Sequence, residues 1–298
     1  MRSSQAPAPA LVGMVVGGRY RVIQLLGSGG TGQVYLAELC DSTRSGKPPV
    51  PRRRFALKML RDEHCDEPEL VARFDREAMA AARIHHPNVL AVESAPTRWE
   101  GDGERCRFFV MELLVGLDLA DTLSFTGSLG QARSVRVAEG AALGLGAAHE
   151  AGVVHRDVKP ENLFLVHAPD GREQVKVLDF GFSHLPGDPQ ETRGHVVGTP
   201  EYMAPEQARG AAADPRADVY SLGVVLYEML AGHAPFTGSY ARVAKRHARE
   251  RPPPIHSALV SAPLEAVVRR ALEKDPEARF PSMAAFRAAL LEALPGAG

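Results

Sequence analysis

The chain has 298 residues, a formal net charge of −1, 45% hydrophobic residues and 24% charged residues. This composition is ordinary for a globular protein of one large domain or two smaller ones, and the near-neutral charge argues against a general nucleic-acid binder. Its three cysteines, Cys40, Cys65 and Cys106, have no Cys-x-x-Cys spacing. That argues against a disulfide framework or a zinc site and favours a reducing, cytoplasmic setting.

The ends of the chain are predicted to be tails, with residues 1–16 a disordered N-terminal tail rich in Ala, Pro and Ser, and residues 294–298 a C-terminal tail. No segment near the start has the apolar core of a signal peptide. The most apolar later segment, residues 219–230, is interrupted by Ser221 and Glu228. A membrane-spanning helix needs about 20 mostly apolar residues, so we expect no span within this chain. A domain of a longer, membrane-anchored protein would have the same sequence.

The first half of the chain is predicted to be mostly β-structure. A glycine-rich loop separates the first two strands, and a polar insertion at residues 41–54 joins the second to the third. The insertion is expected to be a solvated loop, with docking to an acidic partner as the alternative. A helix is expected at residues 69–83, where apolar residues recur at helical spacing. The five strands are expected at residues 20–26, 33–38, 55–60, 89–93 and 107–112.

After Gly116 the pattern becomes mostly helical. The segment 130–150 is rich in Ala and Leu and stops before Gly152, which suits a helix C-terminus. Two short strands, 163–167 and 174–178, are followed by further helices. These are expected at residues 216–231, 238–249, 260–273 and 281–293. We therefore expect a small β lobe, residues 17–114, followed by a larger, mostly helical lobe, residues 115–293.

The glycine run Gly27-x-Gly29-x-x-Gly32-x-Val34 has the composition of a phosphate-binding loop. Glycines let backbone N–H groups approach phosphate oxygens without hindrance from a Cβ. A single run of this kind is weak evidence, because many tight turns match it. The loop leads into a predicted strand, whereas a dinucleotide-binding loop leads into a helix. The pattern therefore favours a flap that covers the phosphates of a nucleotide.

Charged residues also interrupt apolar segments at three places. Lys58 lies in the apolar strand 55–60, and Glu77, nineteen residues later, is a candidate ion-pair partner for it. The polar segment 155–162 lies between apolar runs, and Asp179 follows the apolar run 175–178. Each has a bland explanation: an edge lysine whose stem is buried, a solvated turn, and an ordinary turn. In the functional interpretation, Asp179 and Asn162 supply oxygen ligands for a divalent cation.

Taken together, the order and spacing of these motifs resemble the protein-kinase family, specifically Ser/Thr kinases of the type also found in bacteria. The resemblance covers residues 18 to 292, nearly the whole chain. It implies an α+β, bilobal fold: a small five-stranded antiparallel β lobe with one main helix, and a larger, mostly α-helical lobe. The motifs that carry it are Gly27 to Val34, Ala56-Leu57-Lys58, Glu77, residues 155–162, Asp179-Phe180-Gly181, Ala204-Pro205-Glu206, Asp218 and Arg279.

The resemblance implies that ATP binds between the lobes with Mg²⁺, or with Mn²⁺ in its place. Lys58, oriented by Glu77, would contact the α- and β-phosphates. Glu112 to Leu114 would offer backbone hydrogen bonds to the base, and Asp118 would reach the ribose. The implied nucleotide-site residues are Leu26, Gly27, Ser28, Gly29, Gly30, Thr31, Gly32, Val34, Ala56, Lys58, Glu77, Met111, Glu112, Leu114, Asp118, Phe164 and Asp179.

The same resemblance assigns the catalytic residues. Asp157 would accept or orient the proton of the attacking hydroxyl, and Lys159 would stabilise the transferring phosphoryl group. Asn162 and Asp179 would hold the metal. Thr199 would bridge Asp157 and Lys159 and help to select a Ser or Thr hydroxyl on a protein substrate. A lysine two residues after the catalytic aspartate is the Ser/Thr-kinase form.

Other matching residues are expected to be structural. Glu206 and Arg279 would form a buried ion pair, and Asp218 would accept hydrogen bonds from the backbone of the catalytic loop. His155 and Phe180 would pack in the apolar column that links the lobes. Their loss should disturb folding or loop geometry rather than the phosphoryl transfer.

Arg156, just before the catalytic aspartate, suggests regulation by phosphorylation, because a phosphate–arginine pair can order an activation loop. We expect Thr192 to be a principal autophosphorylation site, since it lies mid-loop, whereas Thr199 has a catalytic role. Arg73 and His184 would complete the phosphate pocket. The chain itself is therefore an expected substrate besides other proteins, and a transient dimer would serve that reaction. The acceptor candidates are Ser183, Thr192, Thr199 and Tyr202.

Three rival interpretations explain the sequence less well than an active protein kinase. A pseudokinase would bind nucleotide without turnover, but no catalytic position is missing. A kinase of small molecules would lack the segment from Gly198 to Glu206 and the long loop before it. A structural scaffold would leave the alignment of Lys58, Asp157 and Asp179 unexplained.

Overall fold

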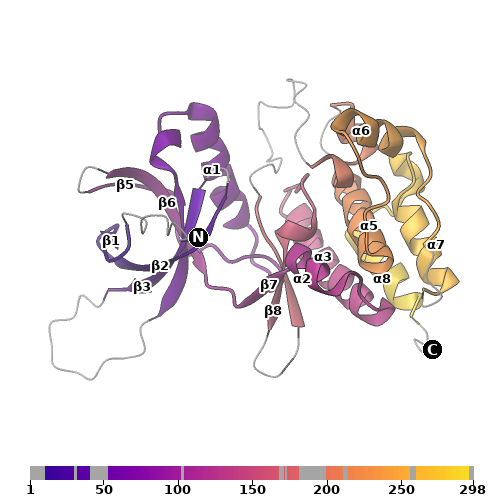
Figure 1. The fold of residues 1–298 in the computed structure, drawn as a ribbon, viewed down its shortest axis with the longest axis horizontal. Coiled ribbons are helices and arrows are strands. Elements are labelled where there is room, and N and C mark those ends of the chain that lie inside the picture. Colours follow the sequence, from indigo (N-terminus) through magenta and orange to yellow (C-terminus); the bar gives the residue numbers. More distant parts are fainter. Residues whose placement is uncertain are drawn as a thin grey trace, which may run out of the picture. The chain divides into compact units, whose positions relative to one another are not determined.

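The computed structural model divides the described chain into two compact units (Figure 1). The first, here the β unit, comprises Met1–Ala82 and Ala91–Leu114, and the second, the helical unit, comprises Arg83–Leu90 and Val115–Gly298. The residues described are 11–29, 32–40, 53–101, 104–167, 171, 173–180, 199–210, 214–255 and 260–294.

The β unit is built on an antiparallel sheet of six strands in the order β1-β2-β3-β4-β6-β5. One main helix, α1 (Pro68–Ala81), is joined to β4 through a short 3-10 turn, Asp62–His64. Arg107 on β6 forms two hydrogen bonds of 2.5 Å with Asp75 on α1, which fastens the helix to the sheet. The strands are β1 (Val15–Val16), β2 (Tyr20–Ser28), β3 (Gly32–Leu39), β4 (Arg54–Leu60), β5 (Thr97–Gly101) and β6 (Glu104–Glu112).

The two faces of this sheet differ in what they carry, because successive side chains of a strand point to opposite faces. On the face with α1, Phe74 packs on Phe109 with 5.0 Å between ring centroids. The opposite face carries the apolar core of the unit. The buried members of that core are Leu11, Val16, Val22, Tyr35, Ala37, Phe55, Leu57, Met59, Phe108 and Val110.

Three expectations for the β unit are wrong in detail. Residues 11–16 are not a disordered tail, since Leu11 and Val16 are buried in the core and Val15–Val16 adds a sixth strand. The segment 89–93 is not a strand; it makes only isolated bridges, such as Val92 with Met111. The strand that completes the sheet edge is β5, which is too polar to have the expected pattern. Residues 1–10 and the insertion residues 41–52 lie outside the described part of the chain.

The helical unit has a small antiparallel sheet and a set of helices, of which the long helix α3 packs against α5, α8 and β9 (Figure 1). The sheet order is β7-β8-β9. Helix α5 is buried along most of its length. The elements are β7 (Gly116–Asp118), α2 (Leu119–Thr126), α3 (Gln131–Glu150), β8 (Leu163–His167), β9 (Glu173–Val177), α4 (Pro205–Ala208), α5 (Pro215–Ala231), α6 (Tyr240–Arg249), α7 (Ala262–Ala271) and α8 (Met283–Glu292).

The predicted helices of this unit are present, with ends that differ by a few residues, whereas the short helices α2 and α4 were not predicted. Three 3-10 turns, Pro160–Asn162, Pro200–Tyr202 and Pro276–Ala278, complete the unit. Within the described ranges, the helices lack the combination of length and apolar composition that a bilayer-spanning helix needs.

The segment Arg83–Leu90 belongs with the helical unit, although the predicted β lobe included it. The backbone of Asn88 and Leu90 is hydrogen-bonded to Val177, and the Asn88 amide donates to the Val175 carbonyl at 2.7 Å. A Cβ at Gly144 on α3 would lie only 2.4 Å from the Asn88 carbonyl oxygen. The close approach of this segment to α3 therefore requires a glycine at that position.

A buried ion pair holds the C-terminal part of the helical unit together. The Arg279 guanidinium, with 1% of the residue exposed, forms two parallel hydrogen bonds of 2.6 and 2.7 Å with the carboxylate of Glu206 on α4. It also donates to the carbonyls of Arg216, Glu273 and Lys274. Because its donors are satisfied in a fixed geometry, this pair connects α4, the start of α5 and the segment after α7.

Arg279→Met should lower the free energy of unfolding by about 3–5 kcal/mol, because it leaves the Glu206 carboxylate buried without a partner. Urea denaturation of the wild type and the variant measures this. In the double variant Arg279→Met/Glu206→Gln the uncompensated charge is gone, so part of the loss should be recovered. Equal loss in the single and double variants would contradict the role given to charge.

His247 on α6 is a buried imidazole with no exposed surface. Burial is the main reason why its pKa is lowered to about 4, and the nearby cations of Lys274 and Arg246 act in the same direction, against the hydrogen bond to Glu201. The ring is therefore neutral in the folded protein at neutral pH.

Between pH 6.5 and about 4 the unfolded chain binds a proton at this position that the folded chain does not bind. The contribution of His247 is therefore fully present above pH 6.5 and is lost as the pH falls through this window, by up to about 3 kcal/mol. Urea unfolding at pH 7 and pH 4.5 should show a smaller loss for His247→Gln than for the wild type. An equal loss in both proteins would contradict a buried, neutral His247.

Candidate active site

In the β unit, strand β4 and helix α1 bring Lys58 and Glu77 together. The Lys58 ammonium lies 2.5 and 2.7 Å from the two oxygens of the Glu77 carboxylate, and both side chains are largely shielded from water. Such a pair is stronger than an exposed one because the surrounding dielectric is low. It fixes the position of the lysine on the sheet.

The sheet register places the other predicted nucleotide residues of the β unit on the same face as Lys58. Val34 pairs with Lys58, and Ala56 pairs with Met111. These four therefore point away from the Tyr35 and Leu57 side of the sheet, where the apolar core lies. Leu26 is 47% exposed beside them. The face combines apolar side chains with one ammonium group, which suits a base and its phosphates.

The glycine loop connects β2 and β3, and its Gly27, Ser28 and Gly29 are exposed. The Gly29 amide donates to the Gly32 carbonyl at 2.9 Å, and Arg61 donates to the Ser28 hydroxyl at 2.8 Å. A Cβ at Gly32 would lie 2.4 Å from the Met59 carbonyl oxygen, so the close strand pairing requires glycine there. Gly30 and Thr31 lie outside the described residues.

Four further predicted nucleotide residues lie at the end of β6 and in the small sheet. The Glu112 carboxylate accepts from the Ala91 amide at 2.7 Å, and Leu114 is the last residue of the β unit. In the helical unit, Asp118 pairs with Phe164 across β7 and β8, and its carboxylate caps α2 by accepting from the amide of Asp121 at 2.7 Å. Glu112 and Asp118 thus have structural contacts of their own.

The catalytic-loop residues of the helical unit form a connected cluster. The Lys159 ammonium lies 2.9 Å from an Asp157 carboxylate oxygen and donates to the Thr199 hydroxyl at 3.1 Å. The Asn162 amide donates to the Asp157 carbonyl at 2.8 Å and to its carboxylate at 3.3 Å. Asp157 and Asn162 are buried. The expected bridge therefore has a different centre: Lys159, rather than Thr199, joins the other two.

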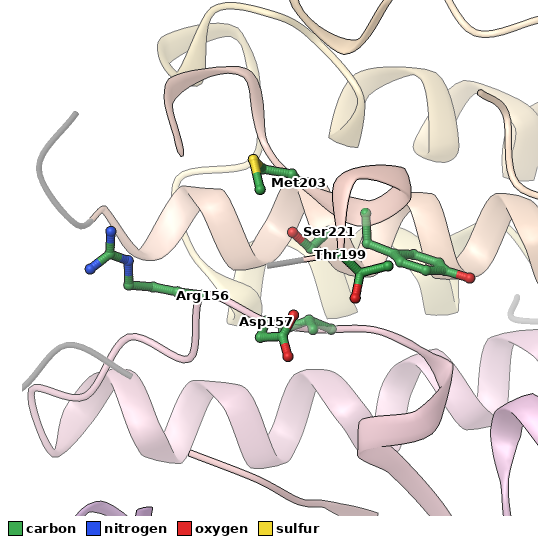
Figure 2. A pocket seen from close by; sticks show the side chains of 7 residues that line it. Arg156, Asp157, Thr199, Met203 and Ser221 are labelled. Atoms are coloured by element: carbon green, nitrogen blue, oxygen red, sulfur yellow. The ribbon is translucent and has the colours of Figure 1, made fainter. Parts of the chain in front are cut away.

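Asp157 and Thr199 also line a small, shallow pocket in the helical unit. Figure 2 shows Thr199 above Asp157, with Ser221 and Met203 beyond Thr199, while the Arg156 side chain points away from Asp157. A carboxylate and a hydroxyl therefore border one small pocket, which is too narrow here to hold a water molecule. A carboxylate next to a hydroxyl is the pairing that a general base uses.

Asp218, at the start of α5 and fully buried, holds the backbone before Asp157. Its carboxylate accepts from the amides of His155 and Arg156 at 2.9 and 2.8 Å and from the His149 ring at 2.7 Å. Burial by itself raises the pKa of the Asp218 carboxyl, but the hydrogen bond from His149, the nearby imidazoles and the Arg156 amide outweigh it and lower the pKa below its ordinary value. The group is therefore an anion at neutral pH.

Arg156 has a φ of 68°, a left-handed conformation that is unfavourable for a residue with a side chain. Besides the Asp218 contact to its amide, its carbonyl accepts from the Gln207 side chain on α4 at 2.8 Å. The roles of His149 and Gln207 are not visible in the sequence, because each acts through contacts with residues more than fifty positions away. No local sequence pattern exists for such contacts.

Asp179 follows β9 and has a φ of 53°. Like Arg156, it is a residue other than glycine in the left-handed conformation. The amide of the preceding Leu178 donates to the Asn162 carbonyl at 2.9 Å, which brings the two predicted metal ligands to neighbouring backbone positions. Since the Asn162 NH₂ group is bound to Asp157, its amide oxygen is left for other contacts. A carboxylate and an amide oxygen are ligands that Mg²⁺ prefers, so these residues fit such an ion.

Phe180 is buried, with 4.8 Å between its ring centroid and that of His155. The His155 ring donates to the Leu178 carbonyl at 2.8 Å and accepts from the Asp157 amide at 3.2 Å. His155 therefore connects the catalytic loop to the segment that carries Asp179. The expected packing of His155 on Phe180 is present within the helical unit.

Several expected residues lie outside the described ranges, namely Gly181, Ser183, His184 and Thr192. Arg73 on α1 is described. Over the described ranges, no group of three or more His, Cys, Asp or Glu side chains is arranged to hold a metal ion. A site with two protein oxygens completed by phosphates and water does not need such a group.

Comparison with known proteins identifies the family. Residues 20–290 match the protein kinase domain. The chain is 39% identical over 289 residues to serine/threonine-protein kinase pkn3 of Myxococcus xanthus, covering 94% of this chain and 50% of that protein. It is 40% identical over 278 residues to PknA of Mycobacterium tuberculosis, covering 92% of this chain and 61% of that protein. The chain thus spans about half the length of the curated relatives it matches.

Solved structures agree on the fold. The kinase domain of Mycobacterium tuberculosis PknI matches 95% of this chain and 98% of its own length, with a TM-score of 0.66 and 28% sequence identity. A double-mutant form of the same domain matches 99% of this chain and 100% of its own, with a TM-score of 0.68. The bilobal α+β protein-kinase fold expected from the sequence is thereby confirmed, and the chain belongs to the protein kinase family, among its bacterial-type Ser/Thr members.

Proposed function

We propose that this chain is an active Ser/Thr protein kinase that transfers the γ-phosphoryl group of ATP to Ser and Thr hydroxyls of proteins in bacterial-type signalling. The observation that carries the proposal is the cluster of Asp157, Lys159, Asn162 and Thr199. In it, a buried carboxylate, an ammonium, an amide and a hydroxyl converge beside a small pocket. A nucleotide-binding domain without turnover would not need a carboxylate aimed into that pocket.

Asp157 is the proposed general base. Its carboxylate is held in place by Asn162 and Lys159. It therefore accepts a hydrogen bond from the substrate hydroxyl and takes the proton of that hydroxyl as the new oxygen–phosphorus bond forms. The Lys159 ammonium offsets the negative charge of the group in transfer. The Thr199 hydroxyl accepts from Lys159 and keeps the ammonium between the two oxygens. Catalysis here is positioning and electrostatic stabilisation, as phosphoryl transfer requires.

Nucleotide binding is assigned to both units separately. In the β unit, Lys58, fixed by Glu77, would contact phosphate oxygens, and backbone amides of the exposed glycine loop would do the same. The apolar face formed by Val34, Ala56 and Met111 would contact the adenine. In the helical unit, Asp179 and the Asn162 amide oxygen would hold Mg²⁺, with Mn²⁺ as an alternative. The ion, when bound, neutralises part of the phosphate charge.

Regulation by autophosphorylation is part of the proposal. The Arg156 side chain points away from Asp157 (Figure 2), so its guanidinium is available to a phosphate on the segment after Asp179. Thr192 is the proposed principal acceptor, with Ser183 and Thr199 as further candidates; the contact of the Thr199 hydroxyl with Lys159 fits a catalytic role for Thr199 better. A phosphate supplied by a second copy of the chain would require only a transient dimer, and a cytoplasmic location would supply ATP.

Asp157→Asn should lower the rate of phosphate transfer by about 10²–10⁴-fold, because the general base is lost while the side chain keeps its shape. The measurement is transfer of label from radiolabelled ATP to a generic Ser/Thr protein substrate. The exposed Asp121→Asn on α2 is the matched control and should label like the wild type. Digestion of the labelled wild-type chain then identifies the modified residues.

Equal labelling by the wild type and Asp157→Asn would contradict the role of Asp157. Labelling by neither would identify a nucleotide-binding pseudokinase. Absence of label from Thr192 in an actively autophosphorylating wild type would exclude it as the principal site.

A further inference from the structure

Three polar side chains outside the catalytic loop meet in the interior of the helical unit. Tyr220 on α5 and His247 on α6 have no exposed surface, and Lys274, between α7 and the turn Pro276–Ala278, is partly buried. Buried polar groups are costly unless they are hydrogen-bonded. None of the three has a role in the transfer described above, so their arrangement needs an explanation of its own.

The three side chains form a continuous chain of hydrogen bonds. Lys274 Nζ donates to Tyr220 Oη at 3.0 Å, Tyr220 Oη lies 2.8 Å from His247 Nδ1, and His247 Nε2 lies 2.8 Å from the Glu201 carbonyl oxygen. An ammonium can only donate, and a carbonyl can only accept. The Tyr220 hydroxyl therefore donates to Nδ1, and Nε2 carries the hydrogen that is given to Glu201. The contacts therefore allow one direction for the hydrogen bonds, from Lys274 to Glu201, and one tautomer of the His247 ring.

The surroundings keep the Tyr220 hydroxyl and the Lys274 ammonium in the protonation states that these hydrogen bonds require. Burial raises the pKa of the Tyr220 hydroxyl, so it remains a donor. The pKa of Lys274 is lowered to about 8, mainly by burial and then by the charge of Arg279, which leaves an ammonium at pH 7. Aromatic contacts fill the remaining space: the Phe236 ring lies edge-on to His247, with 4.9 Å between centroids, and Lys274 Nζ lies 5.2 Å from the Phe236 centroid.

The series of hydrogen bonds from Lys274 through Tyr220 and His247 ends on the segment that borders the pocket of Asp157. Glu201 is the middle residue of the turn Pro200–Tyr202, which follows Thr199 directly. From the other side, the Tyr202 hydroxyl donates to Glu228 on α5 at 2.7 Å, and Thr199 accepts from Lys159. The His247 ring contacts the Glu201 main-chain carbonyl from the interior of the unit. His247 thus fixes the backbone of this segment from behind the pocket.

We infer that His247, oriented by Tyr220 and Lys274, is a positioning residue for binding of the protein substrate. The segment 199–203 supplies Thr199, Tyr202 and Met203 to the lining of the pocket, so a shift of its backbone alters the surface that an acceptor peptide meets. The described hydrogen bonds of Tyr220, His247 and Lys274 in this series all join residues of the helical unit. This inference rests on the proposed function, in which the acceptor hydroxyl enters that pocket.

The test compares Michaelis constants for a Ser/Thr peptide and for ATP. His247→Phe keeps an aromatic ring beside Phe236 but loses both hydrogen bonds, and should raise KM for the peptide by about 3- to 10-fold, the effect of one buried hydrogen bond. KM for ATP should stay unchanged. His247→Gln places an amide donor near the Glu201 carbonyl and should restore most of the peptide affinity.

Tyr220→Phe removes a single hydroxyl and replaces His247→Phe as the test variant if the latter does not fold. It should also raise KM for the peptide. Its matched control is Tyr227→Phe on the same helix, which removes a hydroxyl from a tyrosine that is also buried but packs on His233. This control should leave both constants unchanged. Thermal unfolding of each variant reports whether the fold is intact.

The outcomes separate the two proposals. Absence of transfer to peptide by the wild type would overturn the proposed function itself. An active wild type with an unchanged peptide KM in folded His247→Phe or Tyr220→Phe would overturn the inference. So would parallel loss of kcat and of both affinities together with thermal stability, or an equal effect of Tyr227→Phe, because each indicates a purely structural role.

Discussion

The arrangement of the candidate active site depends on one buried carboxylate. Asp218 accepts hydrogen bonds from the amides of His155 and Arg156 and from the His149 ring. These contacts hold the backbone of Arg156 in a left-handed conformation that it would otherwise avoid. Because that turn comes immediately before Asp157, it sets the direction in which the catalytic carboxylate points. The stability of the helical unit thus sustains a local strain at the position where the chemistry is proposed.

Two further contacts extend this organisation through the helical unit. The Gln207 side chain holds the Arg156 carbonyl, and the neighbouring Glu206 is bound to Arg279. The catalytic loop, α4 and the C-terminal segment are therefore connected through adjacent residues. His247 reaches the pocket from another direction, through the backbone of Glu201. These distant side chains help to set the backbone around the catalytic cluster. The cluster of Asp157, Lys159, Asn162 and Thr199 alone therefore does not describe the site.

Much of the fold could be predicted because its helices and central strands have regular apolar patterns, as in α3 and β4. The errors occurred where tertiary contacts override local pattern: Val16 is buried although its segment resembles a tail, and the edge strand β5 is polar. In the site, the residues of the catalytic motif were identifiable from their spacing. Their partners were not, since the contact of His149 with Asp218 spans 69 positions, and the central place of Lys159 between Asp157 and Thr199 depends on three-dimensional geometry.

The most direct test of this account is the rate of phosphate transfer by Asp218→Asn. The amide keeps the size of the carboxylate but loses the charge and an acceptor, so at least one of the two backbone N–H groups lacks its partner. We expect kcat to fall by roughly 10- to 100-fold, as for the loss of one or two buried hydrogen bonds to a charged group, with ATP affinity retained. A folded Asp218→Asn variant with the kcat of the wild type would contradict the claim that this carboxylate sets the geometry of the catalytic loop.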